Sequence, residues 1–162
     1  MAKRDWPAAE AVAHEWLGAW SSNEPGGVVL GMQNGAPKLI AAAGHCGVGL
    51  GPIGGDTVFR WASITKHVFA TCLLESKTFA LEMPLGEALP ELATAPAAVT
   101  VGQALAMQGG LPDPRECLTL LGVGTHERTE ADALYRWMAG CDWLNAVPGT
   151  EVAYSNGGYR LL

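Results

Sequence analysis

The sequence contains no run of basic residues and no basic segment interleaved with aromatic ones. Its 16 acidic residues outnumber its 10 lysines and arginines, which gives a formal net charge of −6. Proteins that bind nucleic acid concentrate positive charge on one face, whereas the charge of this chain is spread along its length. We therefore expect no nucleic-acid partner.

Long apolar runs are also missing. The chain opens on Met1-Ala2-Lys3-Arg4-Asp5-Trp6-Pro7 and continues as alanine-rich amphipathic sequence. A secretory signal or a transmembrane helix would need a continuous apolar stretch. We expect no membrane partner and a cytoplasmic protein. With 162 residues, 49% hydrophobic and 16% charged, the chain can bury the core of a globular domain.

The cysteines form no Cys-x-x-Cys pair, and the histidines show no paired spacing of the kind that metal ligands have. Cysteines that are far apart and mostly surrounded by apolar neighbours are typical of reduced, partly buried thiols. We expect no disulfide framework, no metal site and no cofactor. The cysteines are Cys46, Cys72, Cys117 and Cys141.

Hydrophobic spacing predicts a helix, a hairpin and a mainly helical remainder. Apolar residues between Asp5 and Trp20 recur at helical spacing, behind an Asp that can cap the helix. An Asn-Gly step between two short apolar runs, Val28 to Met32 and Lys38 to Ala43, indicates two antiparallel strands. Further helices are expected from Ser63 to about Lys77, from a capping box at Thr100 to Met107, and from a Thr129 cap through Glu130 to Ala139.

The first pair of candidate catalytic residues is Ser63 and Lys66, three apart at the predicted start of a helix. Helical residues at this spacing lie on one face, with β-carbons roughly 5 to 6 Å apart, so the lysine amine can approach the hydroxyl. A serine becomes a nucleophile once a base removes its proton. The alternative is an ordinary helix start with a solvated lysine, because serine is also a favoured helix cap.

The second group is Tyr154-Ser155-Asn156, preceded by Pro148-Gly149-Thr150. Tyrosine offers an acid/base hydroxyl, and asparagine offers an amide that can bind a substrate carbonyl. The alternative is a turn built on Asn156-Gly157-Gly158 with Tyr154 packed beside it.

Together these motifs resemble those of the penicillin-recognising serine hydrolases. The closest branch contains class C β-lactamases, DD-carboxypeptidases, D-aminopeptidases and related esterases. Four segments carry the resemblance: Pro25 to Val29, Thr57 to Lys66, Val99 to Leu105 with the following Gly109 to Pro112, and Pro148 to Asn156. Relatives commonly have Ser-Gly-Leu where this chain has Gly109-Gly110-Leu111.

The resemblance implies a role for each candidate residue. Ser63 would be the acylated nucleophile and its backbone N–H one half of the oxyanion hole, while Lys66 would help to deprotonate it. Tyr154 would pass the proton to the leaving group, and Asn156 would bind the acyl side of the substrate.

The resemblance also implies an α/β (α+β) fold of the serine β-lactamase type, with an antiparallel sheet flanked by helices and a mainly helical region. Residues 1–62 would hold the first helix and strands, and residues 63–162 the nucleophile helix, the helical region and the Tyr-x-Asn loop, as one incomplete catalytic domain. The family's third motif, a Lys or His two residues before a glycine, is not reached before Leu162. We therefore expect an N-terminal fragment that is inactive alone, with the C-terminal strands supplied by a missing segment or a second chain.

The segment Tyr154 to Arg160 resembles D-aminopeptidases more than typical β-lactamases. The expected activity is that of an amidase or aminopeptidase on small D-amino-acid amides or short peptides. Two alternatives remain open. One is an esterase, or a β-lactamase- or DD-carboxypeptidase-like hydrolase, on the same fold. The other is a non-catalytic peptide-binding protein.

Overall fold

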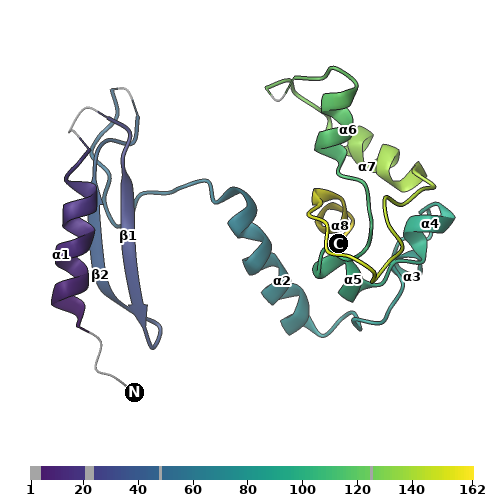
Figure 1. Cartoon of the computed structure of the whole chain (residues 1–162), viewed down its shortest axis with the longest axis horizontal. Helices are drawn as coiled ribbons and strands as arrows, with labels where there is room; N and C mark the ends of the chain where they lie inside the picture. Colours follow the sequence, from purple (N-terminus) through teal and green to yellow (C-terminus); the bar gives the residue numbers. More distant parts are fainter. Residues whose placement is uncertain (1–4, 21–23, 48, 125) are drawn as a thin grey trace. The chain divides into compact units, whose positions relative to one another are not determined.

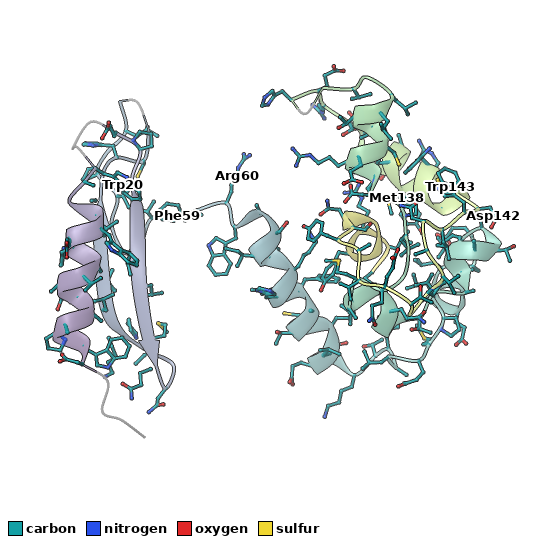
Figure 2. The ribbon with its side chains drawn as sticks, viewed as in Figure 1. Trp20, Phe59, Arg60, Met138, Asp142 and Trp143 are labelled. Atoms are coloured by element: carbon teal, nitrogen blue, oxygen red, sulfur yellow. The ribbon has the colours of Figure 1, made fainter. Side chains whose placement is uncertain are left out.

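The computed structural model describes residues 5–20, 24–47, 49–124 and 126–162. The chain divides into two compact units, Met1–Arg60 and Trp61–Leu162, which Figure 1 draws in purple to blue and in teal to yellow. Phe59 and Arg60, labelled in Figure 2, lie on the exposed connecting segment, which has no regular secondary structure.

The first unit opens with helix α1 (Trp6–Leu17). The carboxylate of Asp5 caps it by accepting a 3.0 Å hydrogen bond from the backbone N–H of Ala8, and a proline stands in the first turn. The helix ends before the predicted Trp20. Its buried residues Ala13 and Leu17 pack with Leu39 and Ala41 of the following hairpin and form a small core.

The predicted hairpin is present as strands β1 (Gly27–Gln33) and β2 (Ala36–Ala43), which pair antiparallel. The turn is shorter than the sequence pattern indicated, because only Asn34 and Gly35 lie between the strands. Their φ angles of 53° and 75° are both left-handed, the conformation of the tight turn that matches strand twist and that Asn-Gly favours. The pairing shifts register between Gly31 and Met32.

The second unit begins with the helix that carries the candidate nucleophile. Ala62–Ile64 form a single 3₁₀ turn, η1, that leads directly into α2 (Thr65–Ser76). The helix ends at Lys77, which adopts a left-handed conformation with φ 53°. The predicted helix from Ser63 to about Lys77 is therefore confirmed, with a 3₁₀ start that the sequence did not indicate.

Six short helices follow α2 among the described residues of the second unit. The capping box between Thr100 and Gln103 is present as predicted. The predicted Thr129 cap is wrong, because Glu130 occupies the N-cap position and no side chain caps that helix. The helices are α3 (Leu85–Ala88), α4 (Thr94–Ala97), α5 (Val101–Leu105), α6 (Pro114–Leu120), α7 (Ala131–Gly140) and α8 (Asn156–Leu161).

The core of this unit lies where α5 and α7 contact α8. Val99 is fully buried, and Met138 of α7 (Figure 2) and Leu161 of α8 are 4% and 6% exposed. Burying an aliphatic side chain of this size stabilises a fold by about 1.5 to 3 kcal/mol. This packing holds α8, and therefore the start of α8, in a fixed place within the unit. None of the helices formed by the described residues is long and apolar enough to cross a membrane.

Candidate active site

Two chain segments of the second unit supply the four sequence-predicted site residues. Ser63 lies in the 3₁₀ turn before α2, and Lys66 lies in the first turn of α2. Asn156 is the first residue of α8, and Tyr154 precedes it by two positions. Between them, the hydroxyl of Ser155 caps α8 by accepting a 2.9 Å hydrogen bond from the N–H of Gly157. This cap directs the chain so that Tyr154 and Asn156 both face α2.

The structure brings all four predicted side chains into one hydrogen-bonded group. Ser63 Oγ lies 2.6 Å from Tyr154 Oη, across 91 positions of sequence. Lys66 Nζ donates to Tyr154 Oη at 2.8 Å and to Ser63 Oγ at 3.3 Å. The serine hydroxyl is therefore within proton-transfer distance of the phenol oxygen, and the lysine contacts both.

Lys66 makes a third short contact, a 2.7 Å hydrogen bond from Nζ to the side-chain oxygen of Asn156. An ammonium group can donate three hydrogen bonds and cannot accept any. Three acceptor oxygens surround the nitrogen of Lys66. Tyr154 Oη is also closer to Ser63 Oγ, at 2.6 Å, than Lys66 Nζ is, at 3.3 Å. The phenol oxygen of Tyr154 is thus the acceptor that the geometry offers to the serine hydroxyl.

The surroundings of Tyr154 favour its deprotonated form. Hydrogen bonds from Lys66, and then from Ser63, lower the pKa of Tyr154 below its usual value, because a phenolate accepts both bonds more strongly than a phenol does. Burial acts weakly in the other direction. The residue is 57% exposed, so the two hydrogen bonds are the main influence on it.

The residue before the nucleophile has an unusual backbone conformation. Ala62 has φ 46°, in the left-handed region that non-glycine residues visit at a cost of roughly 1 to 2 kcal/mol. The irregular segment through Trp61, which itself has φ −80° and ψ −7°, bends at this residue into the 3₁₀ turn. The bend places Ser63 on the side of α2 that faces Tyr154.

Sequence reasoning missed one residue of this group, Asp113. This carboxylate is 5% exposed and accepts hydrogen bonds through one oxygen from both the backbone N–H and the side-chain amide of Asn156, at 2.7 and 2.8 Å. Its other oxygen caps α6 by accepting from the N–H of Arg115 at 2.8 Å. An Asp-Pro step is a helix-start signal, so α6 could have been predicted. The contact with Asn156 could not.

Two cavities adjoin the group at Asn156. One, of about 360 Å³, lies between α6, the segment after it and α8, and Arg115 and Arg160 line it together with Asn156. The other, of about 350 Å³, lies over α2 and is lined by Lys66, Phe69 and, again, Asn156 and Arg160. Substrate-sized space therefore begins beside the amide of Asn156.

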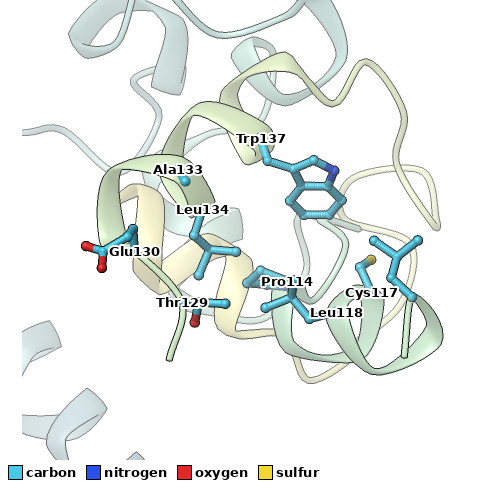
Figure 3. A pocket seen from close by; sticks show the side chains of 9 residues that line it. Pro114, Cys117, Leu118, Thr129, Glu130, Ala133, Leu134 and Trp137 are labelled. Atoms are coloured by element: carbon cyan, nitrogen blue, oxygen red, sulfur yellow. The ribbon is translucent and has the colours of Figure 1, made fainter. Parts of the chain in front are cut away.

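A third cavity, of about 210 Å³, is apolar and lies between α6 and α7 (Figure 3). Trp137 and Leu134 line it from α7, and Cys117 and Leu118 from α6. None of the four predicted site residues reaches it. Among the residues that the structure describes, no group of three or more His, Cys, Asp or Glu side chains is arranged to hold a metal ion.

A family model described as Beta-lactamase matches residues 10–162 of the chain. No curated protein sequence matches the chain. Similar solved structures include a D-amino acid amidase from Ochrobactrum anthropi SV3, which is 23% identical with a TM-score of 0.65. Another is EstCE1, described as a hydrolase with promiscuous acyltransferase activity, which is 21% identical with a TM-score of 0.65.

The alignments include nearly all of this chain but less than half of each solved one. The match covers 94% of this chain and 44% of the amidase, and 96% of this chain and 44% of EstCE1. The same amidase with bound L-phenylalanine amide is 23% identical, with a TM-score of 0.64, and the match covers 98% of this chain and 45% of the amidase. At these identities the likeness concerns the fold.

Proposed function

This chain belongs to the beta-lactamase family, and from that premise we propose that it carries the nucleophile part of a serine hydrolase that works through an acyl-enzyme. The β-lactamase-like fold expected from the sequence is confirmed by the family match and by the solved neighbours. The observation that carries the proposal is the 2.6 Å contact between Ser63 Oγ and Tyr154 Oη, with Lys66 bonded to both.

The proposed first step is attack by Ser63. Before this step the ammonium of Lys66 stabilises Tyr154 as a phenolate, which takes the proton of Ser63 and becomes a phenol. Oγ forms a bond to the carbonyl carbon of the substrate, and the π electron pair of the carbonyl moves to its oxygen. Tyr154 then returns this proton to the leaving amine or alcohol as the bond to the leaving group breaks. In the second half of the reaction, water gives a proton to Tyr154 and attacks the acyl carbon. Tyr154 then passes a proton to Oγ as the bond from Oγ to the acyl group breaks, which releases the acid product and the free Ser63 hydroxyl.

Asn156 is proposed to bind the acyl side of the substrate. One N–H of its amide is used by Asp113, and the second remains for a substrate carbonyl, because an amide nitrogen carries two protons. The cavity of about 360 Å³ beside this amide has room for a small acyl group. Ser63 N–H is proposed as one half of the oxyanion hole.

The proposed substrates are small D-amino-acid amides or short peptides. The D-amino acid amidase among the structural neighbours supports this choice, as does the segment from Tyr154 to Arg160. An ester substrate is the second candidate, and it is favoured by the neighbour EstCE1. In the full-length protein, hydrolysis of D-alanine amide but not of its L-isomer would support the first activity. Hydrolysis restricted to p-nitrophenyl esters would replace it with the second.

We propose that further polypeptide, as a C-terminal segment or a second chain, completes the cleft and supplies the second oxyanion N–H. Ser63 is exposed and Tyr154 is 57% exposed, whereas closure of an active site against bulk water strengthens the electrostatic interactions between its reacting groups. The chain also spans less than half the length of its solved neighbours. In this view residues 1–62 and 63–162 belong to one catalytic domain, and the present residues alone turn over no substrate.

The test is covalent labelling with a fluorophosphonate, followed by mass spectrometry of the peptides. We expect added mass on the peptide that contains Ser63, and none in Ser63→Ala. The matched control is Ser76→Ala, which changes an exposed serine on the same helix and should label normally. Labelling elsewhere, or undiminished labelling of Ser63→Ala, would overturn the proposal. Tight peptide binding without any adduct would indicate a binding protein instead.

A further inference from the structure

The amide of Asn156 lies between two groups of opposite charge. Its nitrogen donates to the buried carboxylate of Asp113 at 2.8 Å, and its oxygen accepts from the ammonium of Lys66 at 2.7 Å. The chain of contacts runs from α6 through the first residue of α8 to α2. Three helices therefore meet at one side-chain amide.

The charges on either side permit only one orientation of this amide. A carboxylate only accepts hydrogen bonds and an ammonium only donates them. Rotating the amide by half a turn would place its oxygen against Asp113 and its NH₂ against Lys66, and both contacts would be repulsive. The backbone N–H of Asn156 also donates to Asp113, at 2.7 Å, so the carboxylate holds the residue at two points.

The oxygens of Asp113 have separate partners. One accepts from the backbone N–H groups of Arg115 and Glu116, at 2.8 and 3.4 Å, and so caps α6. The other is used only by Asn156. A cap alone needs one oxygen and no burial, yet this carboxylate is 5% exposed. Burial of a charged group is costly unless every polar contact is made, and here four donors make them.

We propose that Asp113 is a positioning residue, which acts through the amide of Asn156 to hold the Lys66 ammonium between Ser63 and Tyr154. Without the carboxylate the side-chain amide of Asn156 can rotate. Lys66 then loses its hydrogen bond to the amide oxygen, which holds the ammonium in place beside Ser63 and Tyr154. The inference rests on the proposed function only in its identification of the site. The arrangement itself can be tested without turnover.

The test follows the titration of Tyr154 in Asp113→Asn, a change that keeps the shape of the side chain and removes its charge. Tyrosines labelled with ¹³C at the ring carbon that bears the hydroxyl report each phenol separately by NMR. The chain has three tyrosines, and Tyr154→Phe assigns the signal. Tyr135, bonded to Glu91 at 2.5 Å, is an internal reference.

Asp113 could act on Tyr154 through its charge alone or by positioning Lys66. When the charge is removed, these two roles predict shifts of the Tyr154 pKa in opposite directions. As a distant negative charge, Asp113 raises the pKa of Tyr154, so removal of the charge alone would lower that pKa further. As a positioning residue, it maintains the hydrogen bond from Lys66 that lowers the pKa most. Loss of that bond in Asp113→Asn should move the pKa of Tyr154 upward, towards the ordinary tyrosine value of about 10.

The matched control is Asp142→Asn. Asp142 (Figure 2) is exposed, and its carboxylate also joins distant segments, by accepting from the N–H of Ala95 at 2.8 Å. This variant should leave the signals of Tyr154 and Tyr135 unchanged. Asp113→Ser keeps a capping oxygen for α6 but cannot hold Asn156 at two points, so it should raise the pKa of Tyr154 as Asp113→Asn does.

An unchanged or lowered pKa of Tyr154 in a folded Asp113 variant would overturn the proposal. Unfolding of both Asp113→Asn and Asp113→Ser would do the same, because it would show that the carboxylate serves only the fold. Fluorophosphonate labelling of Ser63 remains a separate measurement. If wild-type Ser63 does not label while the Tyr154 pKa shifts as expected, the proposed function fails and the positioning role stands.

Discussion

Lys66 Nζ lies 2.8 Å from the phenol oxygen of Tyr154 and 5.0 Å from the centre of its ring. The two residues are 88 positions apart in the sequence, so the fold alone brings them together. The ammonium stabilises the phenolate and is the first cause of the lowered pKa of Tyr154. The position of Lys66 thus lowers the pKa of Tyr154.

The reactivity of Ser63 should follow the deprotonation of Tyr154. Because the pKa of Tyr154 is lowered, the labelling rate should rise with pH and reach its midpoint below the ordinary tyrosine value of about 10. The rate is measured with a fluorophosphonate between about pH 6 and 11. Tyr154→Phe should lose this rise, whereas Tyr135→Phe should keep it. A pH profile that is the same in Tyr154→Phe and wild type would exclude Tyr154 as the base.

Replacing Lys66 should affect both the tyrosine and the serine. Lys66→Met removes the donor to Tyr154, so the pKa of Tyr154 should rise and the labelling rate of Ser63 near neutral pH should fall by about 10²- to 10⁴-fold. Lys77→Met, which changes an exposed lysine at the other end of the same helix, should label at the wild-type rate. Equal rates for the two variants would remove Lys66 from the proposed mechanism.

Alanine substitution should destabilise the protein at one helical glycine and not at another. A β-carbon at Gly157 would lie 2.4 Å from the backbone oxygen of Pro112, next to Asp113, so Gly157→Ala should lower the free energy of unfolding by about 1 to 3 kcal/mol. At Gly140, the last residue of α7, no atom other than those of its chain neighbours and of the helix backbone lies within 4 Å of an added β-carbon. Gly140→Ala should be neutral or stabilising by up to about 1 kcal/mol. Chemical denaturation measures both, and equal effects would contradict the packing around Gly157.

The four cysteines should separate into two reactivity classes. Cys46 and Cys72 are exposed. Burial raises the pKa of both Cys117 and Cys141, and the charge of Asp113 raises that of Cys117 further. Because the thiolate is the reactive form, iodoacetamide near pH 8 should modify Cys46 and Cys72 first. Peptide mass spectrometry over time tests the order, and early modification of Cys117 would contradict it.

Local interactions explain what could be predicted from the sequence. The Asp5 cap, the Asn34-Gly35 turn and the capping box at Thr100 each depend on residues within a few positions of one another, and all three are present. The predicted Thr129 cap is wrong, although it too depends on neighbouring residues. Several residues of that segment can serve as a helix start, and the chain places Glu130 at the N-cap, which local pattern alone does not decide.

The sequence by itself also determined that Ser63 and Lys66 share one face, because three positions separate them at the start of a helix. Tertiary structure decided the rest. Tyr154 meets Ser63 across 91 positions, and Asp113 meets Asn156 across 43, because α8 packs on a core that it shares with α5 and α7 and against which Leu73 of α2 also packs. Contacts at such separations depend on how buried faces fit together, which neither residue type nor spacing records.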